Sequence, residues 1–324
     1  MNINMIHDAA TRLRGHVRHT PLLSSPALDA IAGRRLLVKA ECLQHTGSFK
    51  YRGARAAISA LDPAARAAGV LAYSSGNHAQ GVALAARDFA TDAVILMPSD
   101  APAGKIAATR ALGAELVLYD RAREDRDALA ARLAQERALT LIKPFDDAMV
   151  IAGQGSVGLE IAADLGDITA SVLVPCGGGG LSAGVALALA EKAPAMRVHP
   201  VEPAGFDDTA RSLASGTIQR NSRSAGGLCD AILTPAPGTL TFPILKRLSG
   251  PGLVVSEGEV LHAMALAFAH LKLVAEPGGA VALAAALFHP DALEGDIVVA
   301  VISGGNVDAP IFQRALREYD QGEG

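Results

Sequence analysis

The fold of this chain is constrained most by the alternation of short apolar runs with segments of helical pattern. Runs typical of β-strands lie at residues 36–40, 70–73, 93–97, 114–119, 171–175, 198–201 and 297–302. Helical patterns follow several of them, at residues 48–61, 77–88 and 181–191. Such alternation predicts parallel sheets covered by helices, which is an α/β fold.

The length of the chain argues for two sheets. Its 324 residues, half of them hydrophobic, are more than one small sheet can organise. No low-complexity linker divides the sequence. We therefore expect two α/β lobes that are interleaved along the chain and enclose a cleft.

Composition limits the partners and the compartment. The formal net charge of -4 is spread over mixed signs, which argues against nucleic acid or a membrane surface as a partner. The apolar run at 280–288 is too short to span a bilayer. Cys42, Cys176 and Cys229 include no Cys-x-x-Cys pair, and residues 1–8 lack the pattern of a signal peptide. We therefore expect reduced thiols in a cytoplasmic protein.

A glycine-rich loop, Gly177–Gly180, joins a predicted strand to a predicted helix. Glycines let backbone N–H groups converge on a phosphate, and the helix N-terminus adds partial positive charge. A tight turn alone needs fewer glycines, so we interpret the loop as a phosphate site. It matches neither the dinucleotide fingerprint nor the Walker loop.

Two more loops follow predicted strands, at the edge where parallel sheets bind ligands. One is Ser303–Asn306, and the other is Ser74-Ser75-Gly76-Asn77-His78. Hydroxyls and N–H groups of the second loop could hold a carboxylate at the start of a helix. Ser and Asn are also ordinary helix caps, so the residues alone leave both interpretations open.

Lys50 lies in the segment Gly47–Gly53, just inside a predicted helix. A lysine beside Gly and Ser is usually a solvated loop residue. Together with the two loops after residues 73 and 176, however, it suggests a lysine that carries a covalently bound aldehyde cofactor.

These motifs, in this order, resemble the threonine dehydratase/serine racemase family of pyridoxal-phosphate enzymes of fold type II. The resemblance runs from about residue 15 to residue 310 and also includes Thr20–Leu22, Lys39–Gly53, Ala152–Gly155 and Glu276–Gly279. It implies a homodimer of chains with two interleaved parallel-sheet α/β domains and the cofactor in the cleft between them. The implied domains are 1–67 with 148–324, which is the large cofactor-binding domain, and 68–147, which is the small one.

The resemblance also assigns the cofactor residues. Lys50 would form the Schiff base and later move protons at the substrate Cα. A hydroxyl at Ser303, facing the pyridine nitrogen, does not force that nitrogen to be protonated, which favours loss of a β-substituent. The implied cofactor-binding residues are Phe49 (ring), Lys50, Asn77 (O3′), Gly177, Gly178, Gly179, Gly180 and Leu181 (phosphate), and Ser303.

The substrate carboxylate is assigned to the loop after residue 73. The implied substrate-binding residues are Ser74, Ser75, Gly76, Asn77 and His78. Ser75 resembles the serine that racemases of this family use as the acid/base opposite the lysine, so it is a second catalytic candidate beside Lys50. We expect the His78 side chain to pack or to form a local hydrogen bond, and not to act as a general base.

Glu202 and Asp208 are hard oxygen ligands that could hold Mg²⁺, Mn²⁺ or Ca²⁺. Their spacing alone is more typical of a solvated acidic turn. The resemblance favours a divalent cation here, because metal-dependent members carry one at this place, with the Phe206 carbonyl as third ligand.

Three functional hypotheses follow. The leading one is a pyridoxal-phosphate-dependent ammonia-lyase that converts a β-hydroxy-α-amino acid of the L-threonine/L-serine type into a 2-oxo acid and ammonia. The second is an amino-acid racemase, or a lyase for 3-hydroxyaspartate or another bulky β-hydroxy substrate, on the same scaffold. The third, from a different class, is a phosphate- or nucleotide-binding protein without catalysis.

Overall fold

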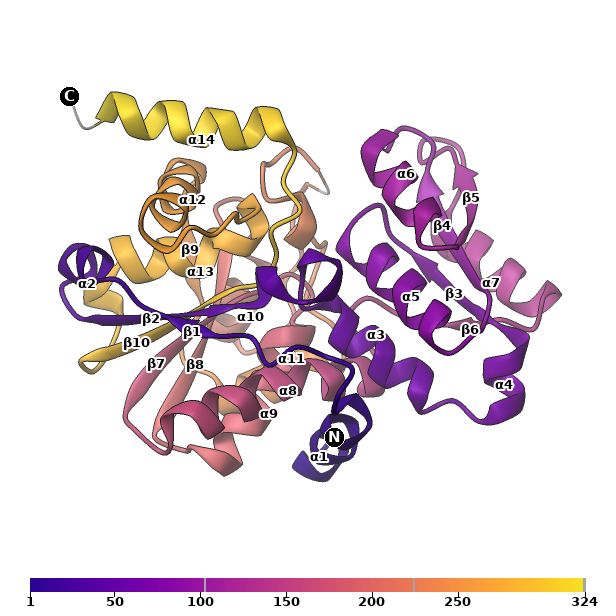
Figure 1. Cartoon of the computed structure of the whole chain (residues 1–324), viewed down its shortest axis with the longest axis horizontal. Coiled ribbons are helices and arrows are strands. Elements are labelled where there is room, and N and C mark those ends of the chain that lie inside the picture. The colour runs from indigo at the N-terminus through magenta and orange to yellow at the C-terminus, as the bar shows by residue number, and fades with distance from the viewer. Residues whose placement is uncertain (102, 224, 323–324) are drawn as a thin grey trace.

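The computed structural model describes residues 1–322 apart from residues 102 and 224, and it contains two β-sheets (Figure 1). The larger sheet is parallel except at its edge, where β1 is antiparallel to β2. Its strands, in spatial order, are β1 (Leu22–Leu23), β2 (Arg35–Ala40), β10 (Ile297–Ile302), β7 (Ala170–Pro175), β8 (Met196–Pro203) and β9 (Leu253–Val255).

The smaller sheet is parallel throughout. Its order is β5 (Glu115–Tyr119), β4 (Ala93–Pro98), β3 (Val70–Tyr73) and β6 (Thr140–Leu141). The predicted fold class is confirmed, and each predicted strand is present. The sequence pattern missed β1, β6 and β9, because two or three residues are too few to show a period.

Helices cover both sheets. Around the large sheet lie α1 (Ile3–Leu13), α2 (Pro26–Ala32), α3 (Lys50–Ser59), α8 (Ala148–Leu165), α9 (Gly180–Lys192), α10 (Asp208–Ser215), α11 (Thr241–Leu248), α12 (Glu257–Leu271), α13 (Pro277–Phe288) and α14 (Ala309–Gly322). Around the small sheet lie α4 (Pro63–Ala68), α5 (Asn77–Asp88), α6 (Ala103–Ala111) and α7 (Arg126–Glu136). The small sheet therefore falls inside the predicted 68–147 segment, while the boundaries themselves stay a prediction.

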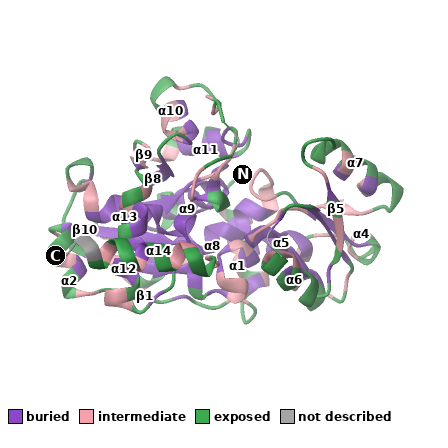
Figure 2. Ribbon diagram, turned by 90° about the horizontal axis from the view of Figure 1, so that it is seen from above, coloured by how far each residue is buried: buried purple, intermediate pink, exposed green. Residues whose placement is uncertain are grey.

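The strand β10 shows how the large domain is layered. Its residues Val298, Ala300 and Ile302 pack in one core with α12 and α13. Val299 and Val301 pack in another core with α8 and α9. Burial of both faces explains the continuous apolar run of this strand. Figure 2 shows α13 and α9 buried over most of their length, as helices next to such a sheet should be.

The helix α8 is long and apolar enough to cross a membrane by length and composition alone. It packs against α1, α3 and α9, and much of it is buried. Its apolar composition is therefore accounted for by its place among these helices.

Candidate active site

Lys50 is the first residue of α3, two residues later than the predicted helix start. The helix starts later because Ser48 is extended and forms a β-bridge with Gly304. The Phe49 N–H donates to the Ser303 carbonyl at 3.1 Å. The lysine segment and the Ser303–Asn306 loop, distant in the sequence, are thus joined side by side.

The Lys50 side chain is half-buried between the Pro144 carbonyl and the Phe49 ring. Its Nζ donates to the Pro144 carbonyl at 2.9 Å and stands 5.0 Å from the centre of the Phe49 ring. Burial lowers the pKa of Lys50 to about 8, although the nearby Glu276 carboxyl opposes this shift. A larger share of neutral amine at neutral pH makes Lys50 a better nucleophile and base.

The glycine loop has the features of a phosphate cradle. Among the described residues, no acceptor is found for the N–H groups of Gly177–Gly180 or Leu181. The Gly178 carbonyl points the other way and accepts from the Thr241 hydroxyl at 2.6 Å. Free donors at the start of α9 fit an anion, which is the requirement for a cofactor phosphate.

Glycine is required at two positions of this loop. Gly179 has φ +88°, and a Cβ on Gly178 would come within 2.2 Å of the Phe145 ring. Phe145 follows Pro144, whose carbonyl accepts from Lys50. The glycine loop and the lysine therefore border the same segment.

The loop after β3 ends at the N-terminus of α5. The Gly76 N–H donates to the Ser74 hydroxyl at 3.1 Å, and the N–H groups of Asn77 and His78 have no acceptor within the described chain. The His78 ring is buried, and its Nε2 lies 2.8 Å from the Ile142 carbonyl. Burial, reinforced by Lys50, lowers the pKa of His78 to about 3. The His78 ring is therefore neutral and bonded to Ile142, as expected, and its role in substrate binding stays a prediction.

Asn77 is the centre of a hydrogen-bonded chain between the two domains. Its Nδ2 donates to Glu276 Oε1 at 2.5 Å, and its Oδ1 accepts from Asn306 Nδ2 at 2.7 Å. Glu276 is buried, and burial raises its pKa to about 7. Neither Glu276 nor Asn306 was predicted as a site residue. The available signal was their position directly beside the Pro-Gly-Gly and Ser-Gly-Gly motifs.

Ser303 and Ser75 keep free side chains. Ser303 is only 4% exposed, yet no hydrogen bond of its hydroxyl is found within residues 1–322 as described. The Ser75 hydroxyl, in the loop after β3, is half-buried and likewise has no hydrogen bond among the described residues. Both hydroxyls are therefore available to a bound molecule, as their predicted roles require, and these roles stay predictions.

Glu202, near the end of β8, and Asp208, the first residue of α10, lie close enough for their charges to interact. Glu202 accepts N–H groups of Thr209 and Ala210 at 2.9 and 2.7 Å. Burial raises the pKa of Glu202 to about 8 and that of Asp208 to about 6. Asp208 Oδ2 is buried without a partner in the described structure. Two buried carboxylates with a spare oxygen fit a divalent cation.

The metal site stays a prediction. No group of three or more His, Cys, Asp or Glu side chains that could hold a metal is found among the described residues. The predicted set has only two carboxylates and would need the Phe206 carbonyl and water to complete the coordination.

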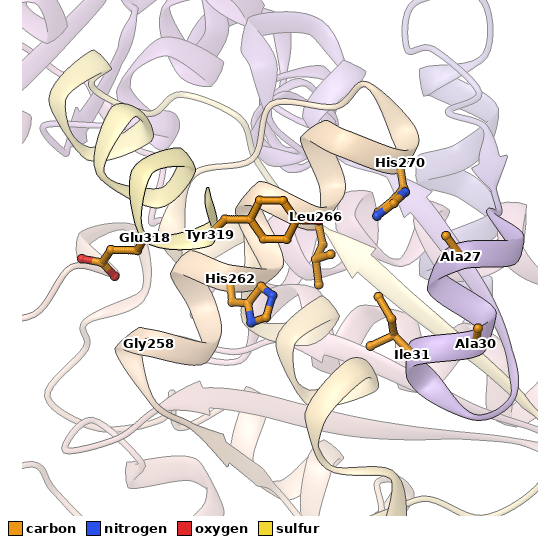
Figure 3. A pocket seen from close by; sticks show the side chains of 9 residues that line it. All are labelled: Ala27, Ala30, Ile31, Gly258, His262, Leu266, His270, Glu318 and Tyr319. Carbon is orange, nitrogen blue, oxygen red and sulfur yellow. The ribbon is translucent and has the colours of Figure 1, made fainter. Parts of the chain in front are cut away.

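A large cavity lies away from these residues. It measures about 690 Å³ and is lined by residues of α2, α12 and α14 (Figure 3). A smaller opening of about 160 Å³ includes Glu276 and Asn306 together with Lys105 of the small domain. Through Glu276 and Asn306, which bond to Asn77, the smaller opening borders the candidate site.

Comparisons with known proteins agree with this geometry. A family model described as pyridoxal-phosphate dependent enzyme matches residues 13–304. An L-threo-3-hydroxyaspartate ammonia-lyase of Pseudomonas sp is 41% identical over 98% of this chain and 100% of the relative. A serine racemase of Oryza sativa subsp. indica is 38% identical over 97% and 94%. The solved structure of maize serine racemase has a TM-score of 0.91 and 35% identity, over 99% of this chain and 98% of that one.

Proposed function

Because this chain belongs to the family of pyridoxal-phosphate-dependent enzymes, we propose that it is an ammonia-lyase for a β-hydroxy-α-amino acid of the L-threonine or L-serine type. The reaction would yield a 2-oxo acid and ammonia. The observation that carries the proposal is the position of Lys50, an amine of lowered pKa that shares the Pro144–Phe145 segment with the glycine loop and lies next to the contact of Phe49 with the Ser303 loop. The family membership also disfavours a phosphate-binding protein without catalysis.

The residues of the chain divide the work. Pyridoxal phosphate, when bound, supplies the aldehyde and the electron-withdrawing ring. The free N–H groups of the glycine loop would hold its phosphate, and Asn77 and Ser303 would hold its ring. The start of α5 would hold the substrate carboxylate. Lys50 would take the proton from Cα and thus start the loss of the β-hydroxyl.

The alternatives share this scaffold. A racemase needs a second proton donor on the face opposite Lys50, and Ser75 with its free hydroxyl could serve. A 3-hydroxyaspartate lyase is favoured by the ammonia-lyase relative of Pseudomonas sp. These substrates differ in their side chains, so a direct assay of each substrate distinguishes the alternatives.

The test is a substrate panel with purified enzyme. L-serine, L-threonine, D-serine and the 3-hydroxyaspartate diastereomers are incubated separately, and ammonia, 2-oxo acid and inverted amino acid are all measured. We expect ammonia and oxo acid in equal amounts, and a Ser75→Ala variant that loses any inversion more than it loses elimination. Inversion without ammonia would reject the lyase as the main activity.

We also propose that Glu202, Asp208 and the Phe206 carbonyl bind Mg²⁺, Mn²⁺ or Ca²⁺ as a structural cation. The support is the buried pair of carboxylates with raised pKa values and the unpartnered Asp208 oxygen. A cation would relieve their repulsion and would fix the start of α10.

If the cation binds here, its effect on the melting temperature should depend on pH. The ordinary pKa is 4.5 for Glu202 and 3.8 for Asp208, and the fold raises these values to about 8 and about 6. Without metal, the protonated carboxyls therefore contribute stability at low pH. That stability is lost as the pH rises through about 6 for Asp208 and about 8 for Glu202. A cation replaces those protons. The rise in melting temperature on adding Mg²⁺, Mn²⁺ or Ca²⁺ should therefore be larger at pH 8 than at pH 5.5, and it should vanish in Glu202→Gln. An equal rise in wild type and variant would contradict the site.

We further propose a cytoplasmic homodimer. The support is that Ile31, Phe268 and Val274 are exposed apolar side chains of the large domain and that all three cysteines are free thiols. Light scattering on the purified protein would measure the mass of the assembly.

A further inference from the structure

The candidate site is divided between the N-termini of two helices. Lys50 begins α3, and Asn77 begins α5. The helices meet at Gly81, where a Cβ would come within 3.0 Å of the Lys50 carbonyl carbon and 3.1 Å of the Tyr51 nitrogen. A side chain at this position would press on the backbone of α3, so the two helix backbones approach each other closely here.

A second contact between these helices lies beside the first. The Tyr51 hydroxyl donates to Asp88 Oδ2, and Arg55 Nη1 donates to the same oxygen at 3.0 Å. Tyr51 is 2% exposed and packs edge-on against His45, and Arg55 stacks on Phe89 at 4.6 Å. Both donors are therefore fixed by packing as well as by the carboxylate.

The cluster is not explained by the stability of α5 alone. Asp88 is the last residue of α5, and a negative charge is unfavourable at a helix C-terminus. A buried phenol and a buried guanidinium both need an acceptor, however, and α3 supplies both donors. The benefit of Asp88 thus lies in joining α5 to α3.

We propose that Asp88 is a positioning residue which, through Tyr51 and Arg55, holds α5 against α3 and so sets the distance between Lys50 and the substrate loop. Tyr51 follows Lys50 in the first turn of α3, so its contact with Asp88 ties the backbone that carries the lysine to α5. The inference rests on the proposed function, because the contacts of Asp88 with Tyr51 and Arg55 are taken to support proton transfer between Lys50 and a bound substrate.

The test compares Tyr51→Phe, Asp88→Asn and the double variant as holoenzymes. We expect kcat to fall about tenfold or more in each, while KM changes less than about threefold, because a small misplacement costs rate more than binding. The double variant should be no slower than Asp88→Asn alone, because both single variants remove the Tyr51–Asp88 contact and only Asp88→Asn also weakens the contact with Arg55. Asp88→Glu, which keeps the carboxylate, should recover part of kcat.

Ser171→Ala is the matched control, because its buried hydroxyl donates to the Glu294 carbonyl at 3.0 Å, away from both helices. It should lower the melting temperature without changing kcat. A wild type that releases no ammonia would refute the proposed function. An active wild type whose Asp88 and Tyr51 variants keep full kcat would overturn this inference alone, and so would a fall in kcat that merely follows the melting temperature.

Discussion

Replacement of Lys50 by alanine should reduce ammonia release by about a thousandfold or more. The variant loses both the amine that attaches the cofactor and the base at Cα, and positioned proton transfer alone contributes about 10²–10⁴-fold. The visible absorbance of lysine-bound cofactor should disappear. Borohydride treatment of wild type, followed by peptide mass analysis, should label Lys50.

The Lys50→Ala variant should keep its fold. The side chain makes one described hydrogen bond, to the Pro144 carbonyl, and burial disfavours its charged form. The melting temperature should therefore stay close to that of the wild type. Lys192→Ala, at an exposed lysine with an ion pair to Glu191, is the control and should keep full activity. Full activity in Lys50→Ala itself would refute the enzyme mechanism.

The parts of the fold that could be predicted are those whose pattern is local. The strand β10 shows an unbroken apolar run because both of its faces are buried, and α5 begins and ends at its predicted residues. The loop at residue 74 follows β3 of the small sheet, and the loop at residue 177 follows β7 of the large sheet. Strand direction was therefore enough to place each loop at the carboxyl edge of its own sheet.

The parts that could not be predicted depend on contacts between distant residues. Nothing near Glu276 in the sequence indicates that its carboxyl meets Asn77, 199 positions away. The Tyr51 phenol likewise meets Asp88 only because α3 crosses α5 at Gly81. Such partners are fixed by helix packing, which a single sequence does not encode locally.

Another set of contacts between residues distant in the sequence is a buried ionic cluster beside α3. Arg52, fully buried, donates through Nε and Nη2 to both oxygens of Glu41, each at 2.8 Å. Its Nη1 donates to Glu160 at 2.6 Å, and Lys39 donates to the same carboxylate at 2.7 Å. Burial alone would raise the pKa of Glu160, but Arg52 and Lys39 outweigh burial and lower it. The cluster joins β2, α3 and α8 beneath the Lys50 turn.

Replacement of Arg52 by methionine should destabilise the protein by about 3–5 kcal/mol, because it leaves the Glu41 carboxylate buried without its cation. The free energy of unfolding, from urea titration of the apoprotein, measures this loss. Since Arg52 stands in the first turn of α3, the holoenzyme should also lose cofactor more readily than the wild type.

In Arg52→Met, the effect of the unpaired Glu41 charge can be separated from the effect of lost packing. If the unpaired charge is responsible, Glu41→Gln in the Arg52→Met background should restore part of the stability, because the neutral amide removes the buried charge. Arg35→Met breaks an exposed pair with Asp29 and should cost less than about 1 kcal/mol. A loss in Arg52→Met no larger than in Arg35→Met would show that the cluster does not hold α3 in place, and the position of Lys50 would then depend on the contacts of α3 with α5.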